Sequence, residues 1–179
     1  RHSFPTRRSS DLPMNLHPIF VHFPIALLII YGLLELLRFN FITRQPYWFY
    51  VKASLVITGA ITTAPALFSG LAIEDTIGPK LHQVVETHQL FAFSSTAIFG
   101  LIALGYLIAW INQHKTCSAK PWQIALKYSH FILSSPLIII LVILGLAAIT
   151  ITGGLGGALA YGPDADPFFR PIYNLLIGN

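Results

Sequence analysis

Four long stretches of apolar residues, separated by short polar segments, dominate the chain. They run roughly over residues 18–37, 48–73, 88–112 and 130–152. Because a helix rises 1.5 Å per residue, about 20 apolar residues cross a hydrocarbon core about 30 Å thick. Each stretch is apolar all round rather than striped, which suits lipid better than a soluble core. The pattern predicts an all-α fold, a four-transmembrane-helix up-and-down bundle.

Composition supports this class. Of the 179 residues, 54% are hydrophobic and only 10% are charged, whereas a soluble domain carries about 25% charged residues. The single cysteine, Cys117, rules out an internal disulfide framework and disfavours a thiolate metal site. No phosphate-binding glycine loop, nucleophile elbow or HExxH motif is present. We therefore expect a non-enzymatic protein whose main partner is the lipid bilayer, with no nucleic-acid partner.

The ends of the chain differ in character from the rest. Residues 1–13 are polar and basic and resemble a translated cloning scar, and the only methionine, Met14, follows them. We interpret residues 1–13 as a non-native or disordered segment and exclude them from the fold. Residues 14–166 are expected to form the membrane domain. Residues 167–179 are expected to form an irregular interfacial tail, anchored by Phe168, Phe169 and Tyr173.

Basic residues in the short loops predict the orientation of the helices. Two loops, after the first and third stretches, contain most of the lysines and arginines outside residues 1–13: Arg38, Arg44, Lys52, Lys115, Lys120 and Lys127. The opposite side contains only Lys80 and Arg170. Because cytoplasmic loops are enriched in lysine and arginine, these loops are predicted to be cytoplasmic. Both termini would then lie on the periplasmic side of a bacterial inner membrane.

Small residues suggest where helices approach and end. In the second stretch, Ala60 with Ala64 and Ala66 with Gly70 have the small-xxx-small spacing that allows close helix packing. A glycine-rich run follows the fourth stretch. Because glycine is a poor helix former, this run is predicted to terminate the fourth helix; its glycines are Gly153, Gly154, Gly156 and Gly157.

An up-and-down bundle would gather polar residues at its outer face. The start of helix one, the end of two, the start of three and the end of four all meet there. They contribute His17, His22, Glu74, Asp75, His82, Glu86, His88, Asp164 and Asp166. Polar groups at membrane depth are costly and usually face the bundle interior or a cavity. The only histidines at the other face, His114 and His130, flank a loop.

Three interpretations of this histidine cluster remain open. First, the histidines are solvated or bonded to backbone carbonyls and only hold helix ends together, in a structural or small-ligand module. Second, His22 and His88 are axial ligands of a haem b between helices. Third, His17, His22, His88 and the carboxylate of Glu86 bind a transition metal such as copper, zinc or iron. Proton relay and quinone binding lack any spacing-specific signal in this sequence.

Four sequence segments in order carry a family resemblance: LHPIFVHFPIALL, TGAITTAPALFSGLAIED, ETHQLFAFSS and GGLGGALAYG. Together they resemble the bacterial membrane-protein family known as domain of unknown function 2231, from Met14 to about Asp166. The family pattern falls on His17, Pro18, His22, Phe23, Pro24, Gly70, His88, Gly156, Gly157 and Tyr161. The Pro-Asp-Ala-Asp-Pro segment after Gly162 departs from it.

The resemblance implies a four-helix integral membrane protein of uncharacterised function. Members of the family are also found joined to, or encoded beside, cytochrome c or Rieske-type redox domains. By this analogy we expect a haem-binding or redox-associated membrane subunit, with a cytochrome or another redox protein as its partner. A homo-oligomer is a further expectation. Kinship of fold does not by itself establish function.

Overall fold

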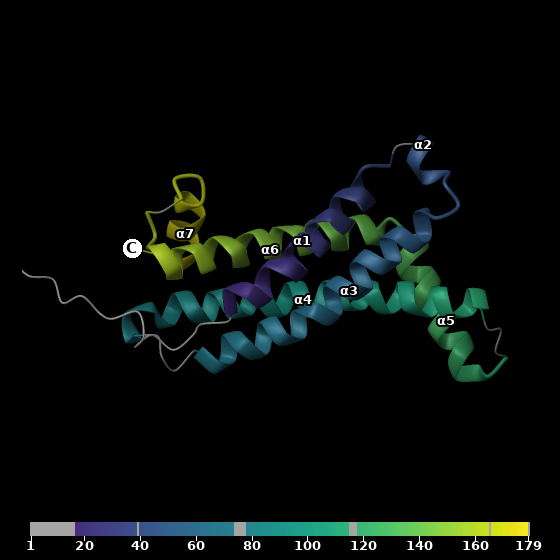
Figure 1. Cartoon of the computed structure of the whole chain (residues 1–179), viewed down its shortest axis with the longest axis horizontal. Coiled ribbons are helices and arrows are strands. Elements are labelled where there is room, and N and C mark those ends of the chain that lie inside the picture. Colours follow the sequence, from purple (N-terminus) through teal and green to yellow (C-terminus); the bar gives the residue numbers. More distant parts are fainter. Residues whose placement is uncertain (1–16, 39, 74–77, 115–117, 165, 179) are drawn as a thin grey trace, which may run out of the picture.

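The computed structural model describes residues 17–38, 40–73, 78–114, 118–164 and 166–178, and within these ranges all regular elements are helices. Four long helices follow the long axis of the molecule (Figure 1). They are α1 (His17–Leu36), α3 (Trp48–Ile73), α4 (His82–His114) and α6 (Leu137–Tyr161). All four are long and apolar enough to cross a membrane. The predicted all-α fold with four membrane-spanning helices is confirmed.

The four long helices form a closed ring. α1 packs on α3 and α4 packs on α6, while contacts of α3 with α4 and of α1 with α6 complete the ring. α1 and α4 therefore lie diagonally across the bundle. The centre is apolar and almost completely shielded, by Leu28, Tyr31, Val56, Phe99, Ile102 and Val142. Apolar side chains such as Ile61 and Phe68 also cover the outside, which is the surface expected to face lipid.

Shorter helices occupy the two ends of this bundle. At one end, α2 (Asn40–Thr43) connects α1 to α3, and α5 (Lys120–Ser134) connects α4 to α6 (Figure 1). At the other end, a 3-10 helix (Pro79–Leu81) leads into α4, and α7 (Arg170–Ile177) packs on α4 and α6. The tail is thus helical after residue 169, where the sequence predicted an irregular segment.

The predicted start of the fourth membrane helix, near His130, was wrong. His130 belongs to α5, which ends at Ser134. Pro136 then caps a separate helix, α6, that begins at Leu137. Proline lacks the N–H needed inside a helix and restricts the residue before it, so the apolar run is divided there. The long apolar stretch therefore contains the end of one helix and the start of another.

The predicted helix termination by Gly153, Gly154, Gly156 and Gly157 was also wrong. α6 continues through all four glycines to Tyr161. The helix ends at Gly162, whose φ of 94° lies in the left-handed region that glycine adopts without strain. Packing overrides the low helix propensity here, because two of the four glycines, Gly154 and Gly156, receive side chains of neighbouring elements against the helix backbone.

The small residues of α3 are divided between two surfaces. Ala66 is buried and Ala60 packs against the core, but Ala64 is exposed. The closest approach of α1 is instead at Gly59, where an added Cβ would lie 2.6 Å from Cδ2 of Leu28. Of the two predicted small-residue pairs, Ala60 with Ala64 does not form one packing surface.

Candidate histidine site and a buried carboxylate

His17 joins the start of α1 to the end of α3. Its Nδ1 lies 2.9 Å from Oγ of Ser69. The single hydroxyl hydrogen of Ser69 is donated to the carbonyl oxygen of Ala66, at 2.9 Å. Because that hydrogen is used, Oγ accepts at the other contact and Nδ1 of His17 donates. The ring lies over Gly70, where an added Cβ would be 3.1 Å from Cε1 of His17.

His88 joins α4 to α6 in a similar way. Its Nδ1 donates to the carbonyl oxygen of Thr152, at 2.9 Å, because a carbonyl oxygen only accepts. The imidazole lies over Gly156, where an added Cβ would be 3.3 Å from Cε1 of His88. The rings of His17 and His88 both lie at the same end of the bundle, where α1 and α4 begin. In the neutral ring, Nδ1–H leaves the lone pair on Nε2. We call this end of the bundle the histidine end.

The other predicted site residues lie apart from this pair. His22 is exposed, and its Nδ1 bonds to the carbonyl oxygen of Pro18 in its own helix. Nδ1 of His82 lies 3.3 Å from Oε1 of Glu86, with both side chains mostly exposed. These two residues belong to the first turns of α4, which begins at His82, six residues before the predicted third stretch. His17 and His88 are thus each held against a neighbouring helix at this end of the bundle, whereas His22 bonds only within its own helix.

Two further observations concern metal binding. Among the residues that the structure describes, no group of three or more His, Cys, Asp or Glu side chains is arranged to hold a metal ion. Glu74, Asp75 and Cys117 lie outside the described residues. The proposed set of His17, His22, His88 and Glu86 is therefore not assembled as a cluster.

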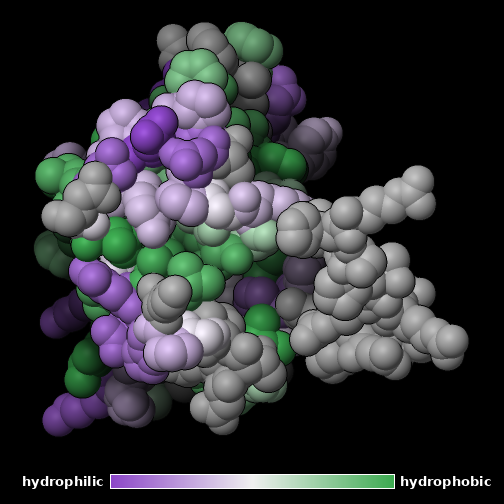
Figure 2. All heavy atoms as spheres, turned by 90° about the vertical axis from the view of Figure 1, so that its left-hand side faces the viewer, coloured by the Kyte–Doolittle hydropathy of each residue, from purple (hydrophilic) through white to green (hydrophobic). Residues whose placement is uncertain are grey.

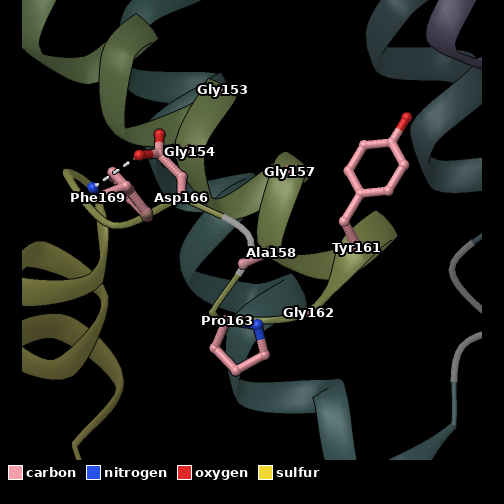
Figure 3. A pocket seen from close by; sticks show the side chains of 9 residues that line it. All are labelled: Gly153, Gly154, Gly157, Ala158, Tyr161, Gly162, Pro163, Asp166 and Phe169. Atoms are coloured by element: carbon pink, nitrogen blue, oxygen red, sulfur yellow. Dashed lines mark hydrogen bonds between the residues drawn. The ribbon is translucent and has the colours of Figure 1, made fainter.

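The surface of the histidine end is mainly hydrophilic around an apolar centre (Figure 2). A pocket of about 270 Å³ opens along the glycine-rich part of α6 (Figure 3). Phe169 closes one side of it, with its ring against Gly154, where an added Cβ would be 2.3 Å from Cδ2. Asp166 Oδ1 accepts hydrogen bonds from the backbone N–H groups of Phe168 and Phe169. Phe169 thus packs the tail on α6 two residues beyond Thr152, whose carbonyl oxygen accepts from His88.

The opposite end contains a polar site that the sequence analysis missed. Glu35, near the end of α1, is only 3% exposed. Its Oε2 lies 2.8 Å from Nζ of Lys52 on α3 and accepts a hydrogen bond of 2.9 Å from the Tyr106 hydroxyl on α4. Longer contacts of 3.4 Å come from Tyr31 and Arg38. We call this end the glutamate end.

Aromatic rings surround the Glu35–Lys52 pair. Nζ of Lys52 lies 5.7 Å from the ring centre of Tyr106 and 6.0 Å from that of Trp48. Among the described residues, all buried side-chain polar atoms have a hydrogen-bond partner. A buried ion pair is tolerated only with such complete hydrogen bonding. The pair therefore fastens α1, α3 and α4 together at this end.

A signal for this site was present in the sequence. Glu35 is an acidic residue inside an apolar helix, and intramembrane ionisable residues mark a paired or functional site. Tyr31 precedes it by four residues and Lys52 lies in the first turn or so of the next helix. The orientation prediction places Lys52 in a loop, whereas it belongs to α3 and pairs with Glu35. An apolar layer that includes Leu28 and Phe99 separates this site from the histidine end.

Four membrane-spanning helices around an apolar core, with a histidine pair at one end and a buried ion pair at the other, define a multi-pass integral membrane protein. The chain belongs to the family described as predicted membrane protein (DUF2231), whose model matches residues 13–164. The resemblance inferred from the four motif segments is thereby confirmed. No curated protein and no solved structure matched the chain.

Proposed function

We propose that the chain is a membrane-embedded binding module in which the imidazoles of His17 and His88 coordinate a transition metal, as a bare ion or as the iron of haem b. The observation that carries this proposal is the shared hydrogen-bond pattern of the two rings. Each Nδ1–H is donated to an oxygen of the adjacent helix, Ser69 Oγ or Thr152 O.

This pattern is typical of metal-ligating histidines. A ligating imidazole usually donates its second N–H to a carbonyl or another acceptor, which orients the ring and raises the basicity of the ligating nitrogen. Imidazole binds copper, zinc, iron and nickel, and two imidazoles are a common axial pair for haem iron. With Nδ1 engaged, Nε2 is the ring nitrogen of His17 and of His88 that would coordinate the metal. The metal or haem would supply the redox or Lewis-acid chemistry.

The proposed pair differs from the pair expected from sequence, which was His22 with His88. Exposure of His22 and its bond within α1 favour His17 as the partner of His88. Two imidazoles leave further coordination positions for haem nitrogens, water or an external ligand. The redox partner implied by family kinship would then approach at the histidine end.

A second candidate function is favoured by the absence, in the described part of the chain, of a group of three or more metal-ligating side chains. In this view the module carries no cofactor, and His17 and His88 only join α1 to α3 and α4 to α6. The two candidates differ in what removal of a ligand does. Chelation or haem extraction lowers the thermal stability of a metal-bound module and leaves a cofactor-free module unchanged.

We also propose that the glutamate end faces the cytoplasm of a bacterial inner membrane. Arg38, Arg44, Lys120 and Lys127 all belong to or adjoin the connections at that end, and cytoplasmic loops are enriched in such residues. Alkaline phosphatase fused after Gly178 should be active, because the histidine end would be periplasmic. An inactive fusion, together with an active one in the α4–α5 connection, would reverse this orientation.

The binding proposal is tested on full-length protein purified in mild detergent from haem- and metal-replete cells. We expect either a Soret band or a transition metal near one per chain, lost in His17→Ala and in His88→Ala. The matched control is His22→Ala, which removes an exposed imidazole and should leave binding unchanged. A colourless and metal-free wild type overturns the proposal. Loss of binding in His22→Ala but not in His17→Ala overturns the assignment of His17.

A further inference from the structure

The two helix pairs bury equivalent positions. α1 buries Pro24, Leu28, Tyr31, Gly32 and Glu35. The positions 71 residues later on α4 are all buried as well: Ser95, Phe99, Ile102, Ala103 and Tyr106. On the returning helices the offset is 86 residues, and three of the five buried residues of α3, Val56, Gly59 and Thr63, correspond to the buried Val142, Gly145 and Ile149 of α6. The two offsets differ by 15, which is the length of α5.

The close contacts within the α1–α3 pair recur in the α4–α6 pair at positions shifted by the same 71 and 86 residues. Leu28 on α1 packs on Gly59 of α3, where an added Cβ would be 2.6 Å from Cδ2. Phe99 on α4 packs on Gly145 of α6, where an added Cβ would be 2.7 Å from Cε2. Residue 99 follows residue 28 by 71 positions and residue 145 follows residue 59 by 86. Both helix pairs are therefore built around the same glycine notch.

The histidine contacts follow this rule too. His17 lies over Gly70, and His88, 71 positions later, lies over Gly156, 86 positions later. The carbonyl oxygen of Ala66 accepts from Ser69, the residue bonded to His17, and the carbonyl oxygen of Thr152 accepts from His88. Thr152 follows Ala66 by the same 86 positions. The two imidazoles thus occupy equivalent places in two equivalent helix pairs.

The arrangement of the helices allows an approximate two-fold axis along the bundle. α1 and α4 run in the same direction and lie diagonally, as do α3 and α6 (Figure 1). Equivalent residues of α1 and α4 therefore face one another across the axis. At the glutamate end this is directly visible, because the equivalent residues Glu35 and Tyr106 are hydrogen-bonded to each other at 2.9 Å.

We infer that the chain is a duplicated helix pair and that His17 and His88 are the two equivalent halves of one site on its pseudo-two-fold axis, coordinating a single metal centre from opposite sides. This inference rests on the proposed metal binding and specifies its ligand class: one metal ion or haem iron with two protein imidazoles. Parallel repeats related by an axis along the membrane normal recur in membrane proteins, and binding sites lie at the repeat interface.

If His17 and His88 are equivalent ligands of one centre, substitution of either should weaken metal binding to a similar extent. Metal-depleted full-length protein is titrated with two probes, hemin and Co²⁺. Wild type should bind one equivalent of at least one probe, with the low-spin spectrum of a bis-imidazole iron if hemin binds. His17→Ala and His88→Ala should each weaken binding by about tenfold or more and to a similar extent. Added imidazole should restore the wild-type spectrum in both variants.

Glycine variants test the same equivalence without removing a ligand. Gly70→Ala and Gly156→Ala each place a Cβ against one imidazole, at 3.1 and 3.3 Å from Cε1. Both should weaken probe binding by a similar factor. Gly157→Ala is the matched control, because no atom lies within 4 Å of its added Cβ. Thermal unfolding of each apo variant shows whether it has folded.

The outcomes separate this inference from the function on which it rests. If wild type binds neither hemin nor Co²⁺, the proposed metal binding fails and the shared centre fails with it. If wild type binds a probe but one histidine variant keeps the wild-type affinity and spectrum, metal binding stands and the two-imidazole centre is overturned. Binding of two independent equivalents per chain, one lost in each variant, also overturns it.

Discussion

Replacement of Lys52 by methionine tests the buried ion pair at the glutamate end. Nζ of Lys52 lies 2.8 Å from Oε2 of Glu35, and the two side chains are 15% and 4% exposed. Methionine preserves most of the apolar stem that lies beside Trp48 and Tyr106 but removes the charge. The variant therefore leaves a carboxylate inside the bundle with its closest cation missing.

The expected loss of stability follows from what remains around Glu35. Removing one partner of a buried ion pair costs about 3–5 kcal/mol, because the other charge stays buried. The Tyr106 hydroxyl still donates at 2.9 Å. Arg38 lies at 3.4 Å and is 56% exposed, so water screens it and it compensates little. We expect a loss of about 3 kcal/mol, at the lower end of that range.

The double variant Glu35→Gln with Lys52→Met distinguishes a buried charge from lost packing. Glutamine keeps an oxygen that accepts from Tyr106 but carries no charge. The double variant should therefore be within about 1 kcal/mol of wild type, and the cycle should give a coupling energy of at least about 2 kcal/mol. Reversible unfolding in mixed detergent micelles, followed by circular dichroism, measures all four proteins.

Lys127→Met is the control for this series. Lys127 is exposed on α5 and has no ion pair within the described part of the chain, so its loss should change stability by no more than about 0.5 kcal/mol. The reasoning is refuted if Lys52→Met is as stable as Lys127→Met. It is also refuted if the double variant loses the sum of the two single losses.

Three further substitutions test the packing. Gly145→Ala should cost about 1–3 kcal/mol, because its Cβ would lie 2.7 Å from Phe99 in a filled core; Gly100→Ala, which has open space at Cβ, should be neutral or slightly stabilising in the same unfolding assay. Gly154→Ala should displace Phe169 and raise hydrogen exchange throughout α7, whereas Gly157→Ala should leave α7 protected; equal exchange in both would contradict the docking of the tail. Tyr106→Phe should cost about 1.5–3 kcal/mol through the lost hydrogen bond to a buried carboxylate, and an unchanged unfolding midpoint would show that Glu35 does not depend on it.

Local features of the sequence were sufficient to predict a helix where the hydropathy of one segment determines its bounds. The helix α3 has the expected bounds and α1 differs from its predicted span by one residue at each end, because the length of an apolar run is a local property. Prediction failed where two effects compete. At Pro136 an apolar run was read as continuous, although proline divides it into α5 and α6. At Gly153–Gly157 the low helix propensity was outweighed by the packing of Phe169 and His88 on the glycines.

The candidate sites show the same limit. His17, His22 and His88 were all identified as candidates at one end of the bundle, but their pairing was not determined. Glu35 was overlooked because its partners come from α1, α3 and α4, and Tyr106 is 71 residues away. A set of contacts that spans three helices has no single spacing in the chain by which to recognise it.

The sequence by itself determined the membrane class and the presence of four spans, since each depends on the hydropathy of single segments. It also determined the end of the bundle where histidines gather, since successive spans run in opposite directions. Tertiary structure alone decided which histidine faces inward. Each residue turns an α-helix by about 100°, so His17 and His22 point about 140° apart around α1. The rotation of α1 is set by the fit of Leu28 into the Gly59 notch, which turns His17 towards α3 and leaves His22 on the outside.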